Sequence, residues 1–349
     1  MGAGASTAAM KAVVLVGGEG TRLRPLTETT PKPLLPLMDR PSLAHVIDHL
    51  GRHGVHEVVL SSPYLERTFH PFIESRRGDP AITWITEREP LGTGGAVMNA
   101  LGALHADAPF FALNGDIVTD LDLTAMLAFH RDAGAAATIA LHHVDDARAF
   151  GLVATDASGR VREFREKPDR AVPGDVNAGT YVLDPEALTA WRRGTHVSIE
   201  REVFPGIIAS GRPVFGFASD AYWLDLGTPQ NYLQAHFDMI EGRVHGVRYA
   251  APWIAEDADV DVRAHLGRWV AVGPGATVGP DSEIDDSVLH AGAVVSAGAR
   301  VVGSVIGSRA RVGPGATLSG CVLGEGSSVA GGVELDGERV PPGIDVLRD

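Results

Sequence analysis

A glycine-rich segment near the start of the chain is the first group of residues that could do chemistry. The apolar run 12–16 leads directly into Gly17-Gly18-Glu19-Gly20-Thr21, and Arg22 follows. Clustered glycines after a strand let backbone amides approach an anion closely, because no Cβ atom intervenes. The segment lacks the third glycine of the dinucleotide fingerprint and the Gly-Lys-Ser/Thr of a P-loop. It therefore predicts a phosphate-binding loop of another type.

Positive side chains close to this loop could neutralise phosphate charge. Lys32, in Pro31-Lys32-Pro33, is one of only three lysines, the others being Lys11 and Lys167. The chain carries a net charge of −14, so a bound phosphate needs a local cluster of positive groups. An Arg side chain can bind two phosphate oxygens together, whereas Lys acts as a compact point charge. Arg22 and Lys32 are therefore candidates for such a positive cluster.

Two aspartates that follow short apolar runs could hold a metal ion. Asp116 ends the run 110–116, and Asp225 lies in Tyr222-Trp223-Leu224-Asp225. Mg²⁺ usually takes one or two carboxylates together with phosphate oxygens and waters. Either aspartate alone could equally be a turn residue, so each is only a candidate Mg²⁺ ligand at this point. None of the 14 histidines shows zinc-site spacing.

The elements that must position these residues alternate between strand-like and helix-like segments from residue 11 to about residue 240. Short apolar runs at 12–16, 57–61, 110–113 and 138–142 predict strands, and 42–51 and 123–133 predict helices. This alternation predicts a Rossmann-like, three-layer α/β domain with a mostly parallel sheet. In such sheets ligands bind beyond the carboxyl ends of the strands, where the glycine-rich segment and Asp116 are expected.

The last part of the chain carries a repeat of six residues. Val272, Val278 and Ile284 show the period, with glycine and other small residues between them. A period of six fits neither a helix nor a single strand, but it fits a prism-shaped β-helix with one inward aliphatic residue on each side. The repeat resembles a left-handed β-helix of three to four coils, although its phase slips around Ser287 and Val302. A short prism leaves flat apolar sides that a second copy can cover, which predicts a homo-oligomer through this domain.

These patterns divide the chain and exclude some classes of partner. We expect a disordered leader at 1–10, a catalytic domain at 11–245, a connector at 246–268 around the acidic stretch 255–261, and the β-helix at 269–349. The negative charge opposes binding to nucleic acid or to an anionic membrane surface. No apolar run approaches the ~18–20 residues of a membrane span. The single cysteine, Cys321, and the absence of a signal-like segment predict a cytoplasmic protein.

The run from Gly17 to Thr27, followed by Pro31-Lys32-Pro33, is similar to the signature of sugar-1-phosphate nucleotidyltransferases. Its closest likeness is to mannose-1-phosphate guanylyltransferases, and the resemblance extends through most of the first 240 residues. It implies Mg²⁺-dependent transfer of a nucleotidyl group from a nucleoside triphosphate to a sugar 1-phosphate, with pyrophosphate released. GTP and mannose 1-phosphate are the favoured substrates.

The same resemblance implies a role for each matched residue. Arg22 would meet the departing phosphates, and Lys32 would lie by the reacting phosphate. Asp116 and Asp225 match the metal-binding aspartates of the family. The residues implied in nucleotide binding are Leu15, Gly17, Gly18, Glu19, Gly20, Thr21, Glu87, Gly92 and Thr93. Those implied in sugar-phosphate binding are Gly151, Glu166, Lys167, Asn177 and Gly179.

Several alternatives remain open at this point. The enzyme could use dTTP with glucose 1-phosphate, or a heptose or cyclitol phosphate in place of mannose 1-phosphate. The chain could also be a catalytically silent regulatory homologue that binds a nucleotide sugar. Acyl transfer by the hexapeptide region is a further option, although that region has no evident catalytic histidine.

Overall fold

The computed structural model describes residues 10–63 and 66–348 of the chain. These residues form two compact units, each built from segments that are distant in the sequence. The first unit comprises the chain up to residue 18 together with 46–117 and 121–223, and the second comprises 19–45, 118–120 and 224–349. Residues 1–9, which hold most of the predicted leader, lie outside the described residues, and Met10 already begins the first strand.

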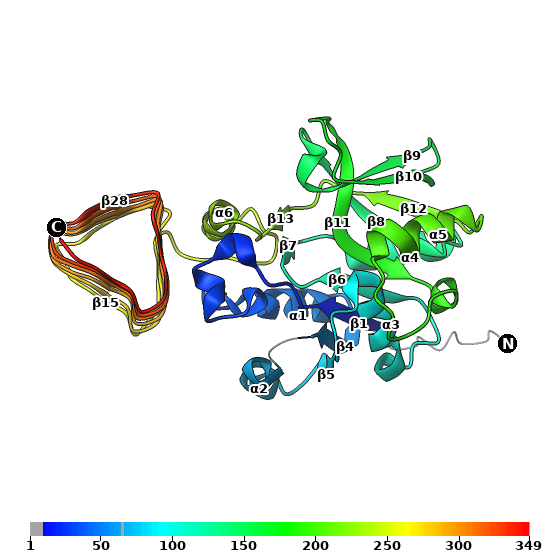
Figure 1. Ribbon diagram of the computed structural model, residues 1–349, viewed down its shortest axis with the longest axis horizontal. Helices are drawn as coiled ribbons and strands as arrows, with labels where there is room; N and C mark the ends of the chain where they lie inside the picture. Colours follow the sequence, from blue (N-terminus) through cyan, green and yellow to red (C-terminus); the bar gives the residue numbers. More distant parts are fainter. Residues whose placement is uncertain (1–9, 64–65, 349) are drawn as a thin grey trace. The chain divides into compact units, whose positions relative to one another are not determined.

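A nine-stranded sheet is the centre of the first unit (Figure 1). β1 (Met10–Leu15) is central and pairs in parallel with β4 (Val55–Ser62) and β6 (Phe110–Asn114). β5 (Ala81–Thr86) continues the parallel part beyond β4. Buried aliphatic side chains fill β1, where Ala12, Val13 and Val14 have no exposed surface. This arrangement confirms the predicted Rossmann-like α/β domain.

The other half of the sheet contains antiparallel strands. β11 (Gly174–Leu183) runs antiparallel to β6 and so reverses the direction of the sheet beside it. The remaining strands of this half are β8 (Ala137–Val144), β9 (Gly151–Thr155), β10 (Val161–Glu166) and β12 (Val214–Ala218), of which β12 is parallel to β8. This half carries the residues that we predicted to bind the sugar phosphate.

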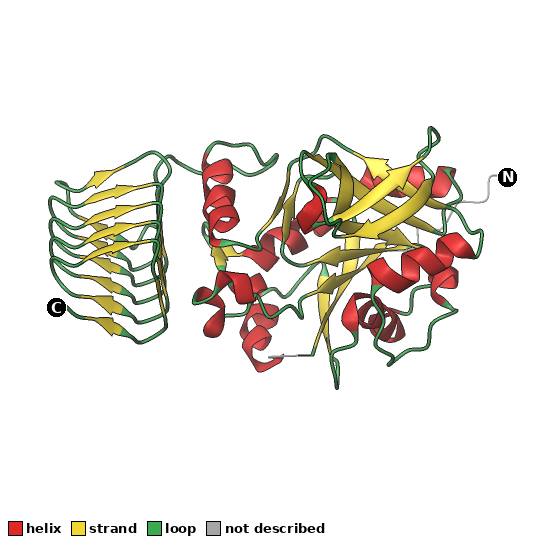
Figure 2. Ribbon diagram, turned by 45° about the horizontal axis from the view of Figure 1, so that its top comes forward, coloured by secondary structure: helices red, strands yellow, loops and turns green. Residues whose placement is uncertain are grey.

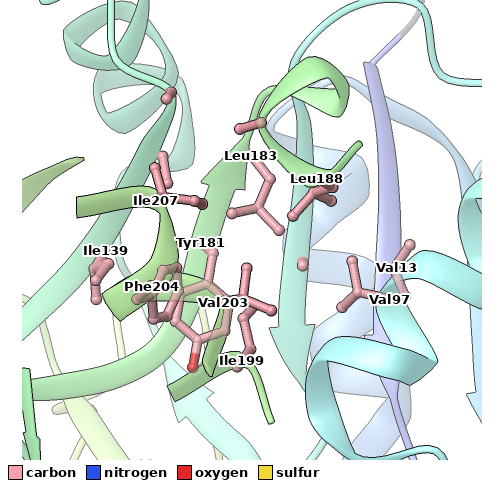
Figure 3. Packing of buried hydrophobic residues seen from close by; sticks show 14 of the residues in the cluster. Val13, Val97, Ile139, Tyr181, Leu183, Leu188, Ile199, Val203, Phe204 and Ile207 are labelled. Carbon is pink, nitrogen blue, oxygen red and sulfur yellow. The ribbon is translucent and has the colours of Figure 1, made fainter. Parts of the chain in front are cut away.

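Helices follow the strands of the parallel half of the sheet, whereas shorter elements link β8 to β11. In the first unit α3 (Gly92–Leu104) presents Val97, Met98 and Leu104 to a core cluster that also contains Val13 and Val59. Figure 3 shows the neighbouring part of this cluster, where Tyr181 lies among Ile199, Val203 and Phe204. The helices are α1 (Ser42–Arg52), α2 (Glu66–Ser75), α3 (Gly92–Leu104), α4 (Leu123–Asp132), α5 (Phe204–Ala209) and α6 (Pro229–Ile240). Among the described residues, none of them has the length and apolar composition needed to cross a membrane.

Short elements complete the two units. Three of them, η1, η3 and β13, contain predicted site residues. The 3₁₀ helices are η1 (Thr21–Leu23), η2 (Leu26–Glu28), η3 (Lys32–Leu34), η4 (Ala147–Ala149) and η5 (Pro185–Leu188), and η6 (Ile199–Val203) is a π-helix. The short strands are β2 (Pro36–Leu37), β3 (Arg40–Pro41), β7 (Ile117–Thr119) and β13 (Trp223–Asp225).

The C-terminal part of the second unit is a three-sided prism of stacked coils, seen end-on in Figure 1 and from the side in Figure 2. All strand pairings between its successive coils are parallel. This confirms the predicted β-helix. One side is β14 (Trp253–Ile254), β17 (Ala271–Val272), β20 (Val288–Leu289), β23 (Val305–Ile306), β26 (Val322–Leu323) and β29 (Arg339–Val340). The second is β15 (Asp259–Val260), β18 (Thr277–Val278), β21 (Val294–Val295), β24 (Arg311–Val312), β27 (Ser328–Val329) and β30 (Asp345–Val346), and the third is β16 (His265–Leu266), β19 (Glu283–Asp285), β22 (Arg300–Val302), β25 (Thr317–Ser319) and β28 (Glu334–Asp336).

Two predictions about the β-helix were wrong. Its first coil begins at Trp253, inside the stretch predicted as a connector, because residues 253–266 pair with the second coil in parallel. Two of its sides hold six strands, so the domain has more than the predicted three to four coils. The hydrophobic period is weak in the acidic first coil and in the last coil, which explains why the sequence pattern underestimated the domain.

The phase slips in the repeat have a structural cause. Ser304 N donates to Ser287 Oγ and Cys321 N donates to Ser304 Oγ, and each pair is 17 residues apart. From the second coil on, a coil therefore has one residue fewer than three hexapeptides, and the missing residue lies at the corner that these side chains occupy. Cys321 is fully buried at this corner, as expected for a residue of the repeat.

One side of the prism is apolar on its outer surface as well as on its inner surface. Alternation along β17, β20, β23 and β26 points Val272, Leu289, Ile306 and Leu323 into the core. The outward-facing Ala271, Val288, Val305 and Val322 are nevertheless at most 4% exposed, so the chain itself covers them. The outward residues of the other two sides are mostly polar, among them Glu283, Arg300, Arg311 and Ser328. The exposed apolar side from which we predicted a homo-oligomer is thus absent among the described coils.

Candidate active site

The glycine-rich segment leaves the sheet at the carboxyl end of β1, after Leu15. A Cβ atom on Gly17 would lie 2.7 Å from Pro63 Cδ, so packing within the first unit requires glycine there. A Cβ atom on Gly18 would meet nothing within 4 Å. Gly18 therefore presents exposed backbone that a ligand can approach, as the phosphate-loop prediction requires.

The segment then enters the second unit, where Glu19 and Thr21 are exposed. Gly20 adopts a left-handed conformation with a φ of 62°, and a Cβ atom on it would lie 2.8 Å from Thr27 Cγ2. Thr27 Oγ1 donates to Gly20 O over 2.8 Å, and this bond closes the loop. Gly20 is therefore required by backbone conformation and by close packing together.

Three predicted residues meet in the second unit. Lys32 Nζ lies 3.3 Å from Asp225 Oδ1, and Arg22 Nη2 lies 3.6 Å from Asp225 Oδ2. The Lys32 side chain is only 8% exposed, whereas that of Arg22 is 62% exposed. The cluster has two positive charges for one negative charge. It therefore supplies the local positive excess that an acidic protein needs in order to bind phosphate.

Neighbouring residues hold this cluster in place. Asp225 O accepts from Asn231 Nδ2 over 2.8 Å, which ties the aspartate to the first turn of α6. Thr228 caps that turn by accepting from Asn231 N over 3.1 Å. A Cβ atom on Gly227 would lie 2.4 Å from Arg22 Nη2, so this glycine makes room for the guanidinium. Asn231 and Gly227 were not among the predicted site residues, because their contacts with Asp225 and Arg22 depend on the folded chain.

Asp116 lies in the first unit, at the carboxyl end of β6. Gly115 N donates to Leu15 O over 2.9 Å, which joins the turn 114–116 to the end of β1. A Cβ atom on Gly115 would lie 2.9 Å from Val16 Cγ1, so only glycine allows this approach. Asp116 is therefore positioned close to the start of the glycine-rich segment.

The second stretch with predicted nucleotide-binding residues, 87–95, is built differently from the first glycine-rich segment. Glu87 is 4% exposed and accepts from Ser61 Oγ over 2.9 Å and from Leu91 N over 3.0 Å. Both carboxylate oxygens therefore bond to the protein itself. This gives Glu87 a structural role at the turn before α3 that we did not anticipate.

The glycines of this segment serve close packing. A Cβ atom on Gly92 or on Gly94 would lie 2.7 Å from Val197, and one on Gly95 would lie 2.5 Å from Thr195 O. Gly94 N and Gly95 N donate to Val197 O over 2.9 and 3.0 Å. Segment 195–199 therefore occupies the amides of Gly94 and Gly95.

Thr93 leads to a carboxylate that the sequence did not reveal. Thr93 Oγ1 donates to Glu200 Oε2 over 2.7 Å and accepts from Ile199 N over 2.9 Å. Ser198 Oγ also donates to Glu200 Oε2, over 2.8 Å. Glu200 lies on η6, a π-helix, and such irregular turns often occur at functional sites. No local motif distinguishes it from Glu202 in the sequence.

The predicted sugar-phosphate residues of the first unit form two adjoining pairs of contacts. Lys167 Nζ lies 3.8 Å from Glu166 Oε1, and a Cβ atom on Gly151 would lie 2.9 Å from Glu166 Oε2. Asn177 Oδ1 accepts from Gly179 N over 2.9 Å. Gly179 has a φ of 71° and packs against Asn114, so the second pair adjoins the turn that carries Asp116.

Electrostatics connects Glu200 with these residues. Burial raises the pKa of Glu166, and the negative charge of Glu200 adds to this effect, while Lys167 and Arg201 oppose it. Burial also raises the pKa of Tyr181 well above its usual value, with further contributions from Glu200, Glu166 and Asp116. The negative charges of three carboxylates thus disfavour the ionised form of this buried tyrosine, whose hydroxyl accepts from Asn177 Nδ2 over 2.8 Å.

An aromatic group next to these residues was missed as well. Trp223 Nε1 donates to Ala178 O over 2.8 Å. Its ring stacks on His142 with 5.0 Å between centroids and meets Phe150 edge-on. Trp223 therefore fixes the backbone between Asn177 and Gly179. Its position two residues before Asp225 was the only sequence signal available.

A metal ion would have few protein ligands. Among residues 10–63 and 66–348, no three or more His, Cys, Asp or Glu side chains are grouped as metal ligands. Asp116 and Asp225 are both carboxylates, and an ion held by one or two such groups must take its other ligands from substrate and water. Each carboxylate, Asp116 in the first unit and Asp225 in the second, is a hard oxygen donor of the kind that Mg²⁺ takes, and neither belongs to a group of described side chains that could hold a structural zinc ion.

Comparison with known proteins decides the family. Residues 11–242 match the family described as Nucleotidyl transferase, and residues 250–348 match the family described as GMPPB C-terminal domain. The chain belongs to the nucleotidyl transferase family. This confirms the resemblance seen in the glycine-rich segment and in Pro31-Lys32-Pro33.

Named relatives resemble this nucleotidyl transferase over most of its length. Mannose-1-phosphate guanylyltransferase of Mycobacterium tuberculosis is 38% identical over 83% of this chain and 82% of its own. Mannose-1-phosphate guanylyltransferase 1 of Arabidopsis thaliana is 35% identical over 80% of this chain and 79% of its own. The crystal structure of HddC from Yersinia pseudotuberculosis complexed with GMP-PN is similar with a TM-score of 0.57 and 29% identity, over 65% of this chain and 97% of that one.

Proposed function

We propose that this nucleotidyl transferase transfers a guanylyl group from GTP to mannose 1-phosphate, forming GDP-mannose and pyrophosphate. The relatives that match most of the chain carry the name mannose-1-phosphate guanylyltransferase. The similar HddC structure holds GMP-PN. The observation that supports the chemistry most directly is the positive cluster of Lys32 and Arg22 at Asp225 in a protein of net charge −14.

The proposed reaction is an in-line displacement at phosphorus. A phosphate oxygen of mannose 1-phosphate attacks the α-phosphorus of GTP, the bond from that phosphorus to the oxygen shared with the β-phosphate breaks, and pyrophosphate leaves. Lys32 neutralises charge on the reacting phosphate, and Arg22 binds the departing phosphates. Fixed positive groups that need no rearrangement lower such a barrier. Positioning and charge neutralisation suffice, because the attacking oxygen already carries charge.

Nucleotide and sugar phosphate would be held by the residues that the family resemblance implies. Gly17, Gly18 and Gly20 would lie along the triphosphate, where the backbone at Gly18 is exposed. Glu87 and Gly92 would shape the base side, and Thr93 would act there through Glu200. Gly151, Glu166, Lys167, Asn177 and Gly179 would hold the sugar phosphate.

We propose Mg²⁺ as the metal, with Asp116 and Asp225 as its protein ligands. When bound, the ion would neutralise charge on the phosphate oxygens. Asp225 would have a second role, because its carboxylate also orients Lys32. Exchange of Asp116 for Asn should weaken the metal dependence of the reaction and leave thermal stability largely unchanged.

Substrate profiling tests the proposal. Pyrophosphate release should be measured with four nucleoside triphosphates, each against mannose, glucose and heptose 1-phosphates. We expect the highest kcat/KM for GTP with mannose 1-phosphate. A preference for dTTP with glucose 1-phosphate would replace it with thymidylyl transfer, and no turnover with any pair would indicate a silent regulatory homologue.

Two further predictions concern the state of the protein. We predict a homo-oligomer in the cytoplasm, although the apolar outer side of the β-helix is covered by the chain itself. Two large apolar side chains of the last coil, Ile344 and Leu347, are exposed and could contact a second copy. Light scattering at micromolar concentration checks the oligomer, and a monomer would contradict it.

A further inference from the structure

One arginine of the β-helix contacts the backbone of residues 22–24, which directly follow the glycine-rich segment 17–20. Arg339 Nη1 donates to Arg22 O over 2.9 Å and to Arg24 O over 3.0 Å. Arg339 lies on β29, in the last strand of the prism side whose outer surface is apolar. The three residues belong to the same compact unit, although more than 300 residues separate them in the sequence: the spacings are 317 and 315.

The register of the prism shows that this arginine stands out in its column. The pairings along this side align Ala271, Val288, Val305 and Val322 with Arg339. The four preceding residues are apolar and almost fully buried, whereas Arg339 is exposed. The row of aligned apolar residues therefore ends at Arg339, a charged donor that bonds to the backbone of Arg22 and Arg24.

The carbonyl groups that Arg339 binds belong to the end of a short helix. Inside the turn, Leu23 N donates to Gly20 O over 2.9 Å and Arg24 N donates to Thr21 O over 3.2 Å. The carbonyl groups of Arg22 and Arg24 come next along the chain and accept from Arg339. A positive donor at the carboxyl end of a helical turn satisfies carbonyl groups that the turn itself cannot bond.

Arg22 depends on its backbone for its direction. Its side chain is 62% exposed, and the ion pair with Asp225 is long at 3.6 Å. Leu23, the next residue, has no exposed surface and anchors one side of the turn. Arg339 anchors the other side. The guanidinium of a long, solvated side chain shifts when its backbone moves. A displacement of about 1 Å relative to the reacting atoms can lower the rate about a hundredfold.

We propose that Arg339 is a positioning residue for nucleotidyl transfer, which fixes the backbone of residues 22–24 so that Arg22 is presented to the departing phosphates. The β-helix then has a part in catalysis in addition to any part in assembly. The predicted effect on catalytic rate rests on the proposed function, but the predicted effect on the backbone of residues 22–24 does not.

The first experiment measures the backbone without reference to activity. Hydrogen exchange of residues 20–26 should be compared between the full-length protein and Arg339→Gln, with Arg300→Gln as the matched control. Arg300 is an outward arginine of another prism side, where it pairs with Glu283. We expect exchange in 20–26 to rise at least severalfold in R339Q only. Unchanged exchange in a folded R339Q protein would overturn the proposal.

The second experiment tests whether Arg339 acts through Arg22. R339Q should lower kcat by about tenfold to a hundredfold, with little change in the KM for the sugar phosphate and in the melting temperature. In an Arg22→Ala background, R339Q should have almost no further effect, because the group that it positions is gone. Arg339→Lys should restore part of the rate, since an ammonium can donate to both carbonyl groups. Equal losses in both backgrounds would overturn the proposal, and so would a loss of rate explained by unfolding alone.

The two experiments separate the failure of each idea. If the wild-type protein shows no transfer with any substrate pair, the proposed function fails, while hydrogen exchange still tests the contact. If transfer is normal in R339Q, the proposed function stands and the positioning role is wrong. Should R339Q not fold, Arg339→Met carries the exchange measurement, where raised exchange in 20–26 supports the role and wild-type exchange overturns it.

Discussion

Two glycine-rich segments, one after β1 and one after β5, look alike in sequence but differ in structure. Both follow a strand, and both contain three glycines within four residues: 17–20 and 92–95. At Gly18 an added Cβ atom would meet nothing within 4 Å, whereas at Gly95 it would lie 2.5 Å from a backbone oxygen. One segment is open to a ligand, and the other is closed by segment 195–199.

The difference shows that clustered glycine has two separate physical uses. Glycine can expose backbone amides, or it can let two pieces of backbone touch. The sequence alone does not separate these uses, because the closing partner of the second segment lies about a hundred residues away, as with Thr93 and Glu200, which are 107 residues apart. Each prediction below tests whether the two segments differ in function as they do in geometry.

The largest effect is expected at the positive group beside the open segment. Lys32→Gln removes the charge but keeps much of the stem, and we expect kcat to fall by about 10²–10³-fold, as for other fixed groups that stabilise transition-state charge. Steady-state pyrophosphate release measures this. Lys11→Gln is the control, because Lys11 pairs with Glu57 and with Leu104 O, away from both segments. Similar losses in the two variants would remove the special role of Lys32.

The next largest effect should be on stability, and only at the closed segment. Gly95→Ala forces a methyl group against Thr195 O and Leu91, and we expect it to destabilise the fold by about 1–3 kcal/mol. Gly102→Ala in the same helix is the control. There the methyl group would meet only the end of the Arg193 side chain, at 3.0 Å, so the helix propensity of alanine should offset the contact. Thermal unfolding measures both variants, and equal melting temperatures would show that segment 195–199 yields easily.

The open segment should show the opposite behaviour. Gly18→Ala adds a methyl group that meets no atom of the protein, so its free energy of unfolding should change by less than about 0.5 kcal/mol. A ligand phosphate that approaches the backbone would meet that methyl group, and we expect the KM for GTP to rise about tenfold, or about 1.4 kcal/mol. An unchanged KM would place the triphosphate elsewhere.

Short-range patterns account for most of what the sequence predicted. The strand 12–16, the helix 42–51 and the β-helix all follow from local periodicity, which is set by residues that are close in the chain. The grouping of Arg22 and Lys32 with Asp225 also agreed with the family resemblance. The contacts of Glu200, Trp223 and Arg339 were not predictable, because each depends on a partner segment that only the folded chain brings near.

The smallest effect is expected on the pKa of Glu166, from the charge of Glu200, which bonds to Thr93 of the closed segment. Burial raises the pKa of Glu166 above its ordinary 4.5, and Glu200 adds to the shift. Because folded Glu166 holds its proton more tightly than the unfolded chain does, its contribution to stability is present below pH 4.5 and is lost as the pH rises through the raised pKa. Glu200→Gln should lower the pKa of Glu166 only partly, since burial is the larger cause, and it should flatten that loss of stability.

Carboxyl titration by NMR measures the pKa of Glu166 in this variant, and Glu202→Gln on the same short helix is the control. A pKa that responds equally to both substitutions would mean that the effect is a diffuse field of the acidic helix. A response to Glu200 alone would mean that the closed segment, through Thr93 and Glu200, sets the charge of a residue predicted to bind sugar. In that case the closed segment would serve the reaction as well, by electrostatics instead of by direct contact.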